Sequence, residues 1–346
     1  MLVESVRYYV AGHTAKGYVN FISSNLKGIN QRITLNHPCN LLKTRIIQEF
    51  INDFSSDYEV EIILSAHGRE YLEGLVIPEK SLSIITNAIL EDGLNSESFN
   101  LAKFVPISGN SQKMEQSVLS YFKEAYSHFE NALSIHDQLE AVYINEMDFE
   151  KADQLAAKFI ENTLGDFRSK NKKSVKKRRL FGTNTYEGAV NIVPELLKRV
   201  KSRFYLKGRA GTGKSTFMRA VIKKCEELGL DMEIYHCSFD PNSVDMVLVP
   251  EADFCIFDST APHEFFPENN QDMIIDLYEK TVTPGTDEKF ATEIEKITNN
   301  YKNEIKNAVN SIKKAREKQV EIEREYSFSR ETVKKIANNL LAAMKK

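Results

Sequence analysis

The stretch Gly208-Arg209-Ala210-Gly211-Thr212-Gly213-Lys214-Ser215-Thr216 is the feature that most constrains the fold of this chain. It fits the pattern G-x-x-x-x-G-K-[ST], which occurs where a β-strand leads into an α-helix. The flanking residues agree with this, because 203–207 form a short apolar run and 214–228 carry apolar residues at helical spacing before Gly229. The sequence therefore predicts an α/β fold built on parallel sheets with flanking helices.

The residue types of this loop suit a bound phosphate chain. Its three glycines let backbone N–H groups converge on an anion, and the next helix adds the partial positive charge of its N-terminus. We expect all of 208–216 to bind nucleotide, with Lys214 at the β- and γ-phosphates and the Ser215 hydroxyl on Mg²⁺. Arg209 would lie at the ligand rather than across from it, so we do not expect it to be an arginine finger. The alternative is a glycine-rich turn that binds nothing.

A second metal ligand is expected at Asp258, which ends the apolar run 252–258. Ligands of parallel sheets lie beyond the carboxyl ends of the strands, so this carboxylate could hold Mg²⁺ directly or through water. The alternative is that Asp258 caps the turn at Ser259-Thr260.

The segment 235–245 is expected to reach the same edge of the sheet. His236, Asp240 and Asp245 are therefore candidates for orienting an attacking water or an acceptor hydroxyl, with His236 and Asp240 the first choices for water. Turn formation around Pro241 is the competing explanation for His236 and Asp240.

The chain also resembles itself at an offset of 171 or 172 residues (17 to 188, 61 to 233). Residues 11–20 align with 182–191, and Val76-Ile77-Pro78-Glu79 aligns with Leu248-Val249-Pro250-Glu251. This pattern indicates a tandem duplication of one α/β unit. We divide the chain into a degenerate unit with a helical extension (1–165), a basic linker (166–180) and an active unit with a helical or coiled-coil extension (181–346).

The first copy lacks the phosphate loop. The equivalent residues 35–44 are one residue shorter, contain no glycine and include Pro38, which has no N–H to donate. Thr86 stands opposite Asp258, and Lys43 is present, though one position out of register by this alignment. We expect a folded unit without nucleotide that serves in packing or partner binding, with a remodelled ligand site as the alternative.

The remaining segments are helical or basic. Residues 111–163 and 286–325 carry apolar stripes that predict long helices, able to pack on their own domain or to bind a protein partner. The run 168–179 holds eight Lys or Arg in twelve residues. A basic run of this kind is most often a solvated linker, and no aromatic residues accompany it, so we do not expect nucleic-acid contact.

Composition narrows the setting further. A net charge of −3 gives no overall basic field, and Cys39, Cys225, Cys237 and Cys255 have no zinc or disulfide spacing. No apolar run approaches the length of a membrane span, and the first residues do not resemble a signal peptide. We expect a cytoplasmic protein that does not enter the membrane.

The chain resembles a bacterial family of tandem P-loop proteins described as ATPases or nucleotide kinases. The resemblance lies in Thr185-Tyr186-Glu187-Gly188, 206–216, His236-Cys237-Ser238, 247–251 and Asp258-Ser259-Thr260-Ala261-Pro262-His263. It implies ATP and Mg²⁺ as cofactors, and the first loop is where this chain departs from the family. We expect a Mg²⁺-dependent ATPase active in its second copy. A small-molecule or nucleotide kinase and a nucleotide-gated scaffold with negligible turnover are the alternatives. No N-K-x-D run occurs, which argues against a GTPase.

Overall fold

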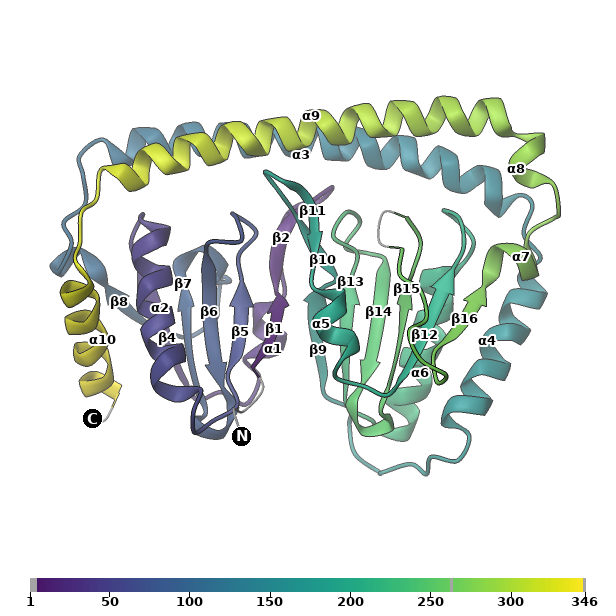
Figure 1. Ribbon diagram of the computed structural model, residues 1–346, viewed down its shortest axis with the longest axis horizontal. Coiled ribbons are helices and arrows are strands. Elements are labelled where there is room, and N and C mark those ends of the chain that lie inside the picture. Colours follow the sequence, from purple (N-terminus) through teal and green to yellow (C-terminus); the bar gives the residue numbers. More distant parts are fainter. Residues whose placement is uncertain (1–4, 262–263, 345–346) are drawn as a thin grey trace.

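The protein consists of two α/β halves that stand side by side beneath a pair of long helices (Figure 1). The computed structural model describes residues 5–261 and 264–344. The last two residues of the Asp258–His263 segment, Pro262 and His263, lie outside this part. In the part of the chain that is described, no helix has the length and apolar character needed to cross a bilayer.

The two halves repeat one order of elements, except that the second half has two additional short helices. The first half contains β1 (Val6–Tyr9), β2 (Ala11–Thr14), β3 (Gly17–Asn20), α1 (Ile22–Asn25), β4 (Gln31–Asn36), α2 (Asn40–Phe54), β5 (Glu61–Leu64), β6 (Leu72–Ile77), β7 (Leu82–Thr86), β8 (Glu97–Asn100), α3 (Ser111–Ile144) and α4 (Phe149–Leu164). The second half contains β9 (Lys176–Leu180), β10 (Gly182–Thr185), β11 (Gly188–Asn191), α5 (Val193–Leu197), β12 (Ser202–Lys207), α6 (Lys214–Leu228), β13 (Met232–His236), β14 (Val244–Val249), β15 (Phe254–Asp258), β16 (Met273–Asp276), α7 (Leu277–Thr281), α8 (Thr286–Lys289), α9 (Ala291–Arg324) and α10 (Arg330–Met344). The two additional helices are α7 and α8.

One large sheet runs through both halves in the order β16-β12-β15-β14-β13-β9-β1-β5-β6-β7-β4-β8. Within each half the strands of this sheet run parallel except for β6 and β14, which are antiparallel to both neighbours. This agrees with the predicted α/β class, because helices cover a mostly parallel sheet. A second, smaller sheet is antiparallel, in the order β11-β10-β2-β3. The β12 and β15 strands are adjacent and parallel, so their carboxyl ends meet at one edge.

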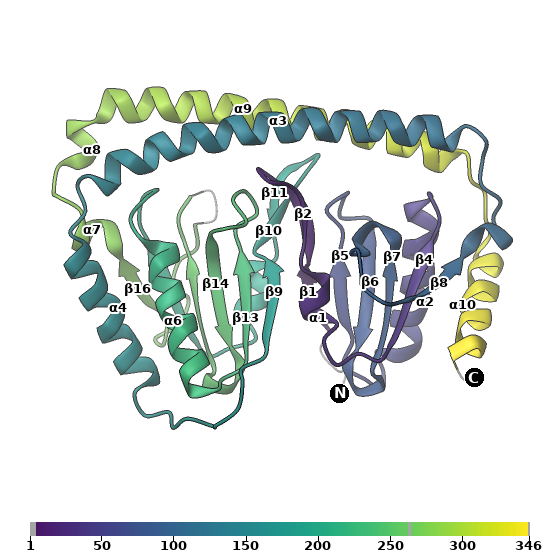
Figure 2. The same cartoon turned by 180° about the vertical axis from the view of Figure 1, so that it is seen from behind.

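The halves join through equivalent strands. Tyr9 of β1 pairs antiparallel with Leu180 of β9, and His13 of β2 pairs with Asn184 of β10. Both pairs join positions 171 residues apart (180 − 9 and 184 − 13), the offset of the sequence repeat. Such self-pairing requires an approximate two-fold axis between the halves. Figure 2, turned by half a rotation, accordingly looks much like Figure 1 with the halves exchanged.

The halves exchange their helical arms. The helices α3 and α9 lie antiparallel against each other above the sheet, and each then crosses to the opposite half (Figures 1 and 2). In consequence α4 packs on α6 of the second half, and α10 packs on α2 of the first. Packing on its own domain and binding a protein partner were the two alternatives for 286–325; α9 instead packs chiefly on α3, the long helix of the first copy.

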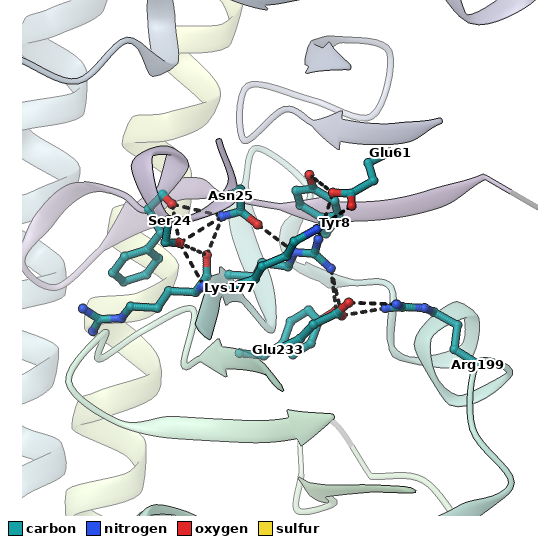
Figure 3. A network of polar contacts seen from close by, with 11 residues as sticks. Tyr8, Ser24, Asn25, Glu61, Lys177, Arg199 and Glu233 are labelled. Carbon is teal, nitrogen blue, oxygen red and sulfur yellow. Dashed lines mark hydrogen bonds and ion pairs between the residues drawn. The ribbon is translucent and has the colours of Figure 1, made fainter. Parts of the chain in front are cut away.

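A buried ionic network fixes the junction between the halves. The Arg179 side chain is fully buried and lies 3.1 Å from Glu61 Oε2 of the first half and 2.8 Å from Glu233 Oε2 of the second. Its guanidinium also lies over the ring of Tyr8, at 3.5 Å. Burial alone would raise the pKa of Glu233, but the Arg179 charge and hydrogen bonds from Arg199 lower it to about 2. Burial would raise the pKa of Glu61 as well, but the charges of Arg179 and Lys177 lower it, so both carboxylates stay ionised in the core. Figure 3 shows this network of Glu61, Glu233 and the cations around them.

The basic run 168–179 is largely neutralised. Within it, Lys170, Lys172, Lys176 and Lys177 pair with acidic side chains. Its last residues belong to β9, a central strand of the sheet. The structure therefore gives this basic run a structural role at the junction.

Candidate functional site

The loop 208–213 joins the carboxyl end of β12 to the N-terminus of α6, as the sequence predicts. Gly211 and Gly213 have φ values of 75° and 81°, in the left-handed region that favours glycine. A Cβ atom on Gly211 would also lie 2.5 Å from the backbone oxygen of Glu140 in α3. The loop thus needs glycine both for its own turn and for the close approach of α3.

Lys214 opens α6 and folds back over the loop. Its Nζ donates to the backbone oxygens of Gly208 (3.1 Å) and Arg209 (2.8 Å). The same ammonium lies 3.6 Å from Oδ2 of Asp258, at the end of the neighbouring strand β15. Residues 44 positions apart in the chain (258 − 214) thus form one charged group at the start of a helix.

Two oxygen donors for a metal ion lie close to this group. The Ser215 Oγ accepts a hydrogen bond from the Val244 N–H (3.0 Å), which fixes its rotamer. Asp258 uses Oδ1 to accept from the Thr260 N–H (3.0 Å), as the capping alternative supposes, while Oδ2 faces Lys214. The two roles of Asp258 are therefore compatible. A hydroxyl and a carboxylate are hard ligands of the kind that Mg²⁺ takes, so the donor set fits this ion.

Asp245 adds a second carboxylate to the site. It lies on β14 directly after Val244, and only 8% of its surface is exposed. Burial, then the charge of Asp258, raises its pKa to about 7, against the opposing effect of Lys214. Asp245 therefore belongs electrostatically to the group formed by Lys214 and Asp258.

The other two candidates lie differently. Asp240 closes a turn, since its Oδ1 accepts from the Asn242 N–H (3.1 Å) and its backbone oxygen from the Ser243 N–H (2.9 Å). Its charge still contributes to the raised pKa of Asp245. The turn geometry agrees with the competing explanation given for Asp240.

His236 lies at the junction of the halves. Its Nε2 accepts from Arg178 Nε (3.0 Å), and its ring stacks on Phe21 of the first half at 4.7 Å. Burial, then the Arg178 charge, lowers its pKa to about 4. The strand that carries it is three places from β12, about 14 Å at ordinary strand spacing. The structure thus places Asp245 on the strand next to that of Asp258, whereas His236 lies one strand farther away.

The first copy preserves the positions but not the loop. Thr44 Oγ1 accepts from the Leu72 N–H at 3.0 Å, just as Ser215 accepts from Val244. Lys43 therefore occupies the place of Lys214 with no shift in register, and it is buried with its Nζ on Asn87 Oδ1 (2.8 Å). The shorter segment is accommodated because α2 begins at Asn40, a turn earlier than the helix of the second copy.

A carboxylate of the chain itself lies at the N-terminus of α2. Glu323, near the end of α9, accepts from the Leu41 N–H (3.2 Å) and from the Tyr71 hydroxyl (2.6 Å). A negative charge at a helix N-terminus is stabilising. In the first copy, Glu323 of the chain itself therefore occupies the helix N-terminus, whereas in the second copy the glycine loop lies at this position.

Residues far from the loop in sequence also surround it. Asp287 of α8 lies 2.8 Å from Arg209 Nη2 and accepts a hydrogen bond from the Tyr143 hydroxyl of α3 at 2.9 Å. No local pattern marks these residues, because the packing of α3 beside α8 and α9 brings them to the loop.

Comparisons of the chain with protein-family models, with curated proteins and with solved structures found no match. The function of the site is therefore inferred from its own geometry.

Proposed function

We propose that this protein is a Mg²⁺-dependent ATPase with a single nucleotide site in its C-terminal copy. The observation that carries the proposal is the arrangement at the start of α6. There a glycine loop, the Lys214 ammonium and the Asp258 carboxylate converge at the carboxyl edge of the sheet. Such an edge is where open α/β sheets bind ligands, and a helix N-terminus favours phosphate.

Each group has a distinct task in this proposal. Lys214 and the loop N–H groups stabilise negative charge on the transferring phosphoryl group. Ser215 and Asp258 hold Mg²⁺, which when bound supplies charge neutralisation on the phosphates. Asp245 positions the attacking water, because it is buried on β14, which pairs with β15, the strand that ends in Asp258. The water oxygen bonds to the γ-phosphorus while the bond from this phosphorus to the β–γ bridging oxygen breaks, and ADP, phosphate and one proton are released.

The test is phosphate release by the purified full chain with ATP and Mg²⁺. Lys214→Ala is expected to abolish release, whereas Lys43→Ala, at the equivalent position of the first copy, is expected to retain it. Thermal melting of both variants checks that each is folded. No release from the wild type, or equal release from Lys214→Ala, would contradict the proposal.

A nucleotide-gated scaffold is the second candidate, favoured by the contact between the loop and the long helices. The Glu140 backbone lies against Gly211, and Arg209 is paired with Asp287. A nucleotide in the loop would therefore be in position to shift α3 against α9. Tight ATP binding without phosphate release would favour this function over hydrolysis.

A further inference from the structure

A cavity of about 390 Å³ opens directly beside the loop. Its walls come from α3, the loop itself, α8 and α9, and are formed by Leu139, Tyr143, Arg209, Ala210, Asp287, Ile294 and Thr298. The volume falls within the range of small-molecule sites, roughly 300–1,000 Å³. The cavity is thus large enough for a ligand and touches the second and third residues of the loop.

The cavity lies on the opposite side of the loop from the charged group. Strand β12 has β15 on one side and β16 on the other. Asp258 ends β15, whereas α7, α8 and α9 follow β16 in the chain and bring Ile294 and Thr298 to the cavity. A triphosphate with its terminal phosphate at Lys214 and Asp258 would therefore extend its other end toward the cavity.

The lining suits a flat, partly polar molecule. Leu139 and Ile294 supply apolar surface from opposite helices, and Thr298 supplies a hydroxyl group. The Arg209 side chain is held in place, because it pairs with Asp287 at 2.8 Å and lies over the ring of Tyr278 at 4.9 Å. The cavity therefore has a preformed polar wall and two apolar walls, the usual composition of a ligand pocket.

We propose that this cavity receives the nucleoside part, base and ribose, of the nucleotide whose phosphates bind 208–216. The inference rests on the proposed function, since it assumes that the loop holds the phosphates. The base lies between Leu139 of α3 and Ile294 of α9, and so contacts the helical arms of both copies. Nucleoside binding then connects α3 and α9 through a ligand that contacts both helices.

The test compares two probes that share phosphates but differ in the nucleoside. ATP·Mg²⁺ and inorganic tripolyphosphate·Mg²⁺ are titrated calorimetrically into the full chain and into Ile294→Trp and Leu139→Trp, which fill the cavity from opposite walls. Both positions are partly exposed, so tryptophan fits without disturbing the core. We expect each variant to weaken ATP binding roughly tenfold or more and to change tripolyphosphate binding less than about twofold. Leu119→Trp, at an exposed position of α3, is the matched control and should change neither.

The outcomes separate the two proposals. Equal weakening of both probes, or ATP binding unchanged in both filled variants, overturns the nucleoside pocket while leaving the phosphate loop intact. If neither probe binds the wild type, or if Lys214→Ala binds both as tightly as the wild type does, the proposed function falls and the pocket falls with it.

Discussion

The buried network at the junction makes the strongest stability prediction, through the substitution Arg179→Met. Arg179 is fully buried and is the cation shared by Glu61 and Glu233, one from each half. It also donates to Asn25 Oδ1 at 3.0 Å. Methionine fills much of the same volume but leaves both carboxylates without their common partner.

The expected loss in the free energy of unfolding is about 3 kcal/mol. Removing one partner of a buried ion pair costs roughly 3–5 kcal/mol, because a buried charge is left uncompensated. The lower end applies here, since Glu61 keeps Lys177 at 2.6 Å and Glu233 keeps Arg199 at 2.6 Å. The matched control is Lys177→Met, whose side chain is 30% exposed, and it should cost only about 1 kcal/mol.

Urea unfolding at neutral pH, followed by circular dichroism, measures both losses from the shift in midpoint. Adding Glu61→Gln to Arg179→Met should recover part of the stability, because it removes one of the uncompensated charges. A loss below about 1 kcal/mol, or one no larger than that of Lys177→Met, would refute the conclusion that Arg179 holds the halves together.

Three further outcomes follow from the geometry. Gly211→Ala should weaken ATP binding about tenfold or more, because its Cβ meets the α3 backbone. Gly285→Ala, with similar φ but open space, should not; calorimetry compares them. Lowering the pH should remove two contributions to the melting temperature, while Asp245, with its pKa near 7 against 3.8 unfolded, adds one as pH falls from 7 to 3.8. Buried neutral His236, with its pKa near 4 against 6.5 unfolded, loses its contribution as pH falls from 6.5 to 4. Glu233, near 2 against 4.5, loses its contribution from 4.5 to 2. The melting-temperature difference between the wild type and His236→Gln should therefore shrink as pH falls from 6.5 to 4, and a difference that does not change with pH would contradict this assignment. Asp258→Asn should lower phosphate release about a hundredfold at equal protein concentration, whereas release like that of the wild type would exclude a role for the carboxylate.

Much of the local structure could be predicted from sequence because its signals are local. The strand, loop and helix around Lys214 follow from apolar spacing and from glycine, and all three appear where expected. The repeat likewise predicted that the element order of one half would recur in the other. The expectation that Asp258 lies near Lys214 needed only the rule that parallel strands present their carboxyl ends at one edge.

The site was less predictable where it depends on contacts between distant segments. His236 ends a strand, so the sequence predicted that it would lie at the same edge of the sheet as Lys214, yet its ring packs on Phe21 of the other half. Lys43 occupies the position of Lys214 because α2 begins about one turn earlier than the helix of the second copy. A sequence alignment with a one-residue gap does not show this earlier helix start. Glu140, Tyr143 and Asp287 reach the loop through helix packing alone.

The sequence by itself determined that this chain contains two copies of one α/β unit, and that the copy with the glycines at 208, 211 and 213 carries the candidate phosphate site. Only the tertiary structure decided how the copies combine. The antiparallel pairing of β1 with β9 merges them into one sheet, and α3 and α9 cross to opposite halves. The physical reason is that strand pairing and helix packing depend on surfaces assembled from residues far apart in the chain, whereas turns and helix starts depend on neighbours.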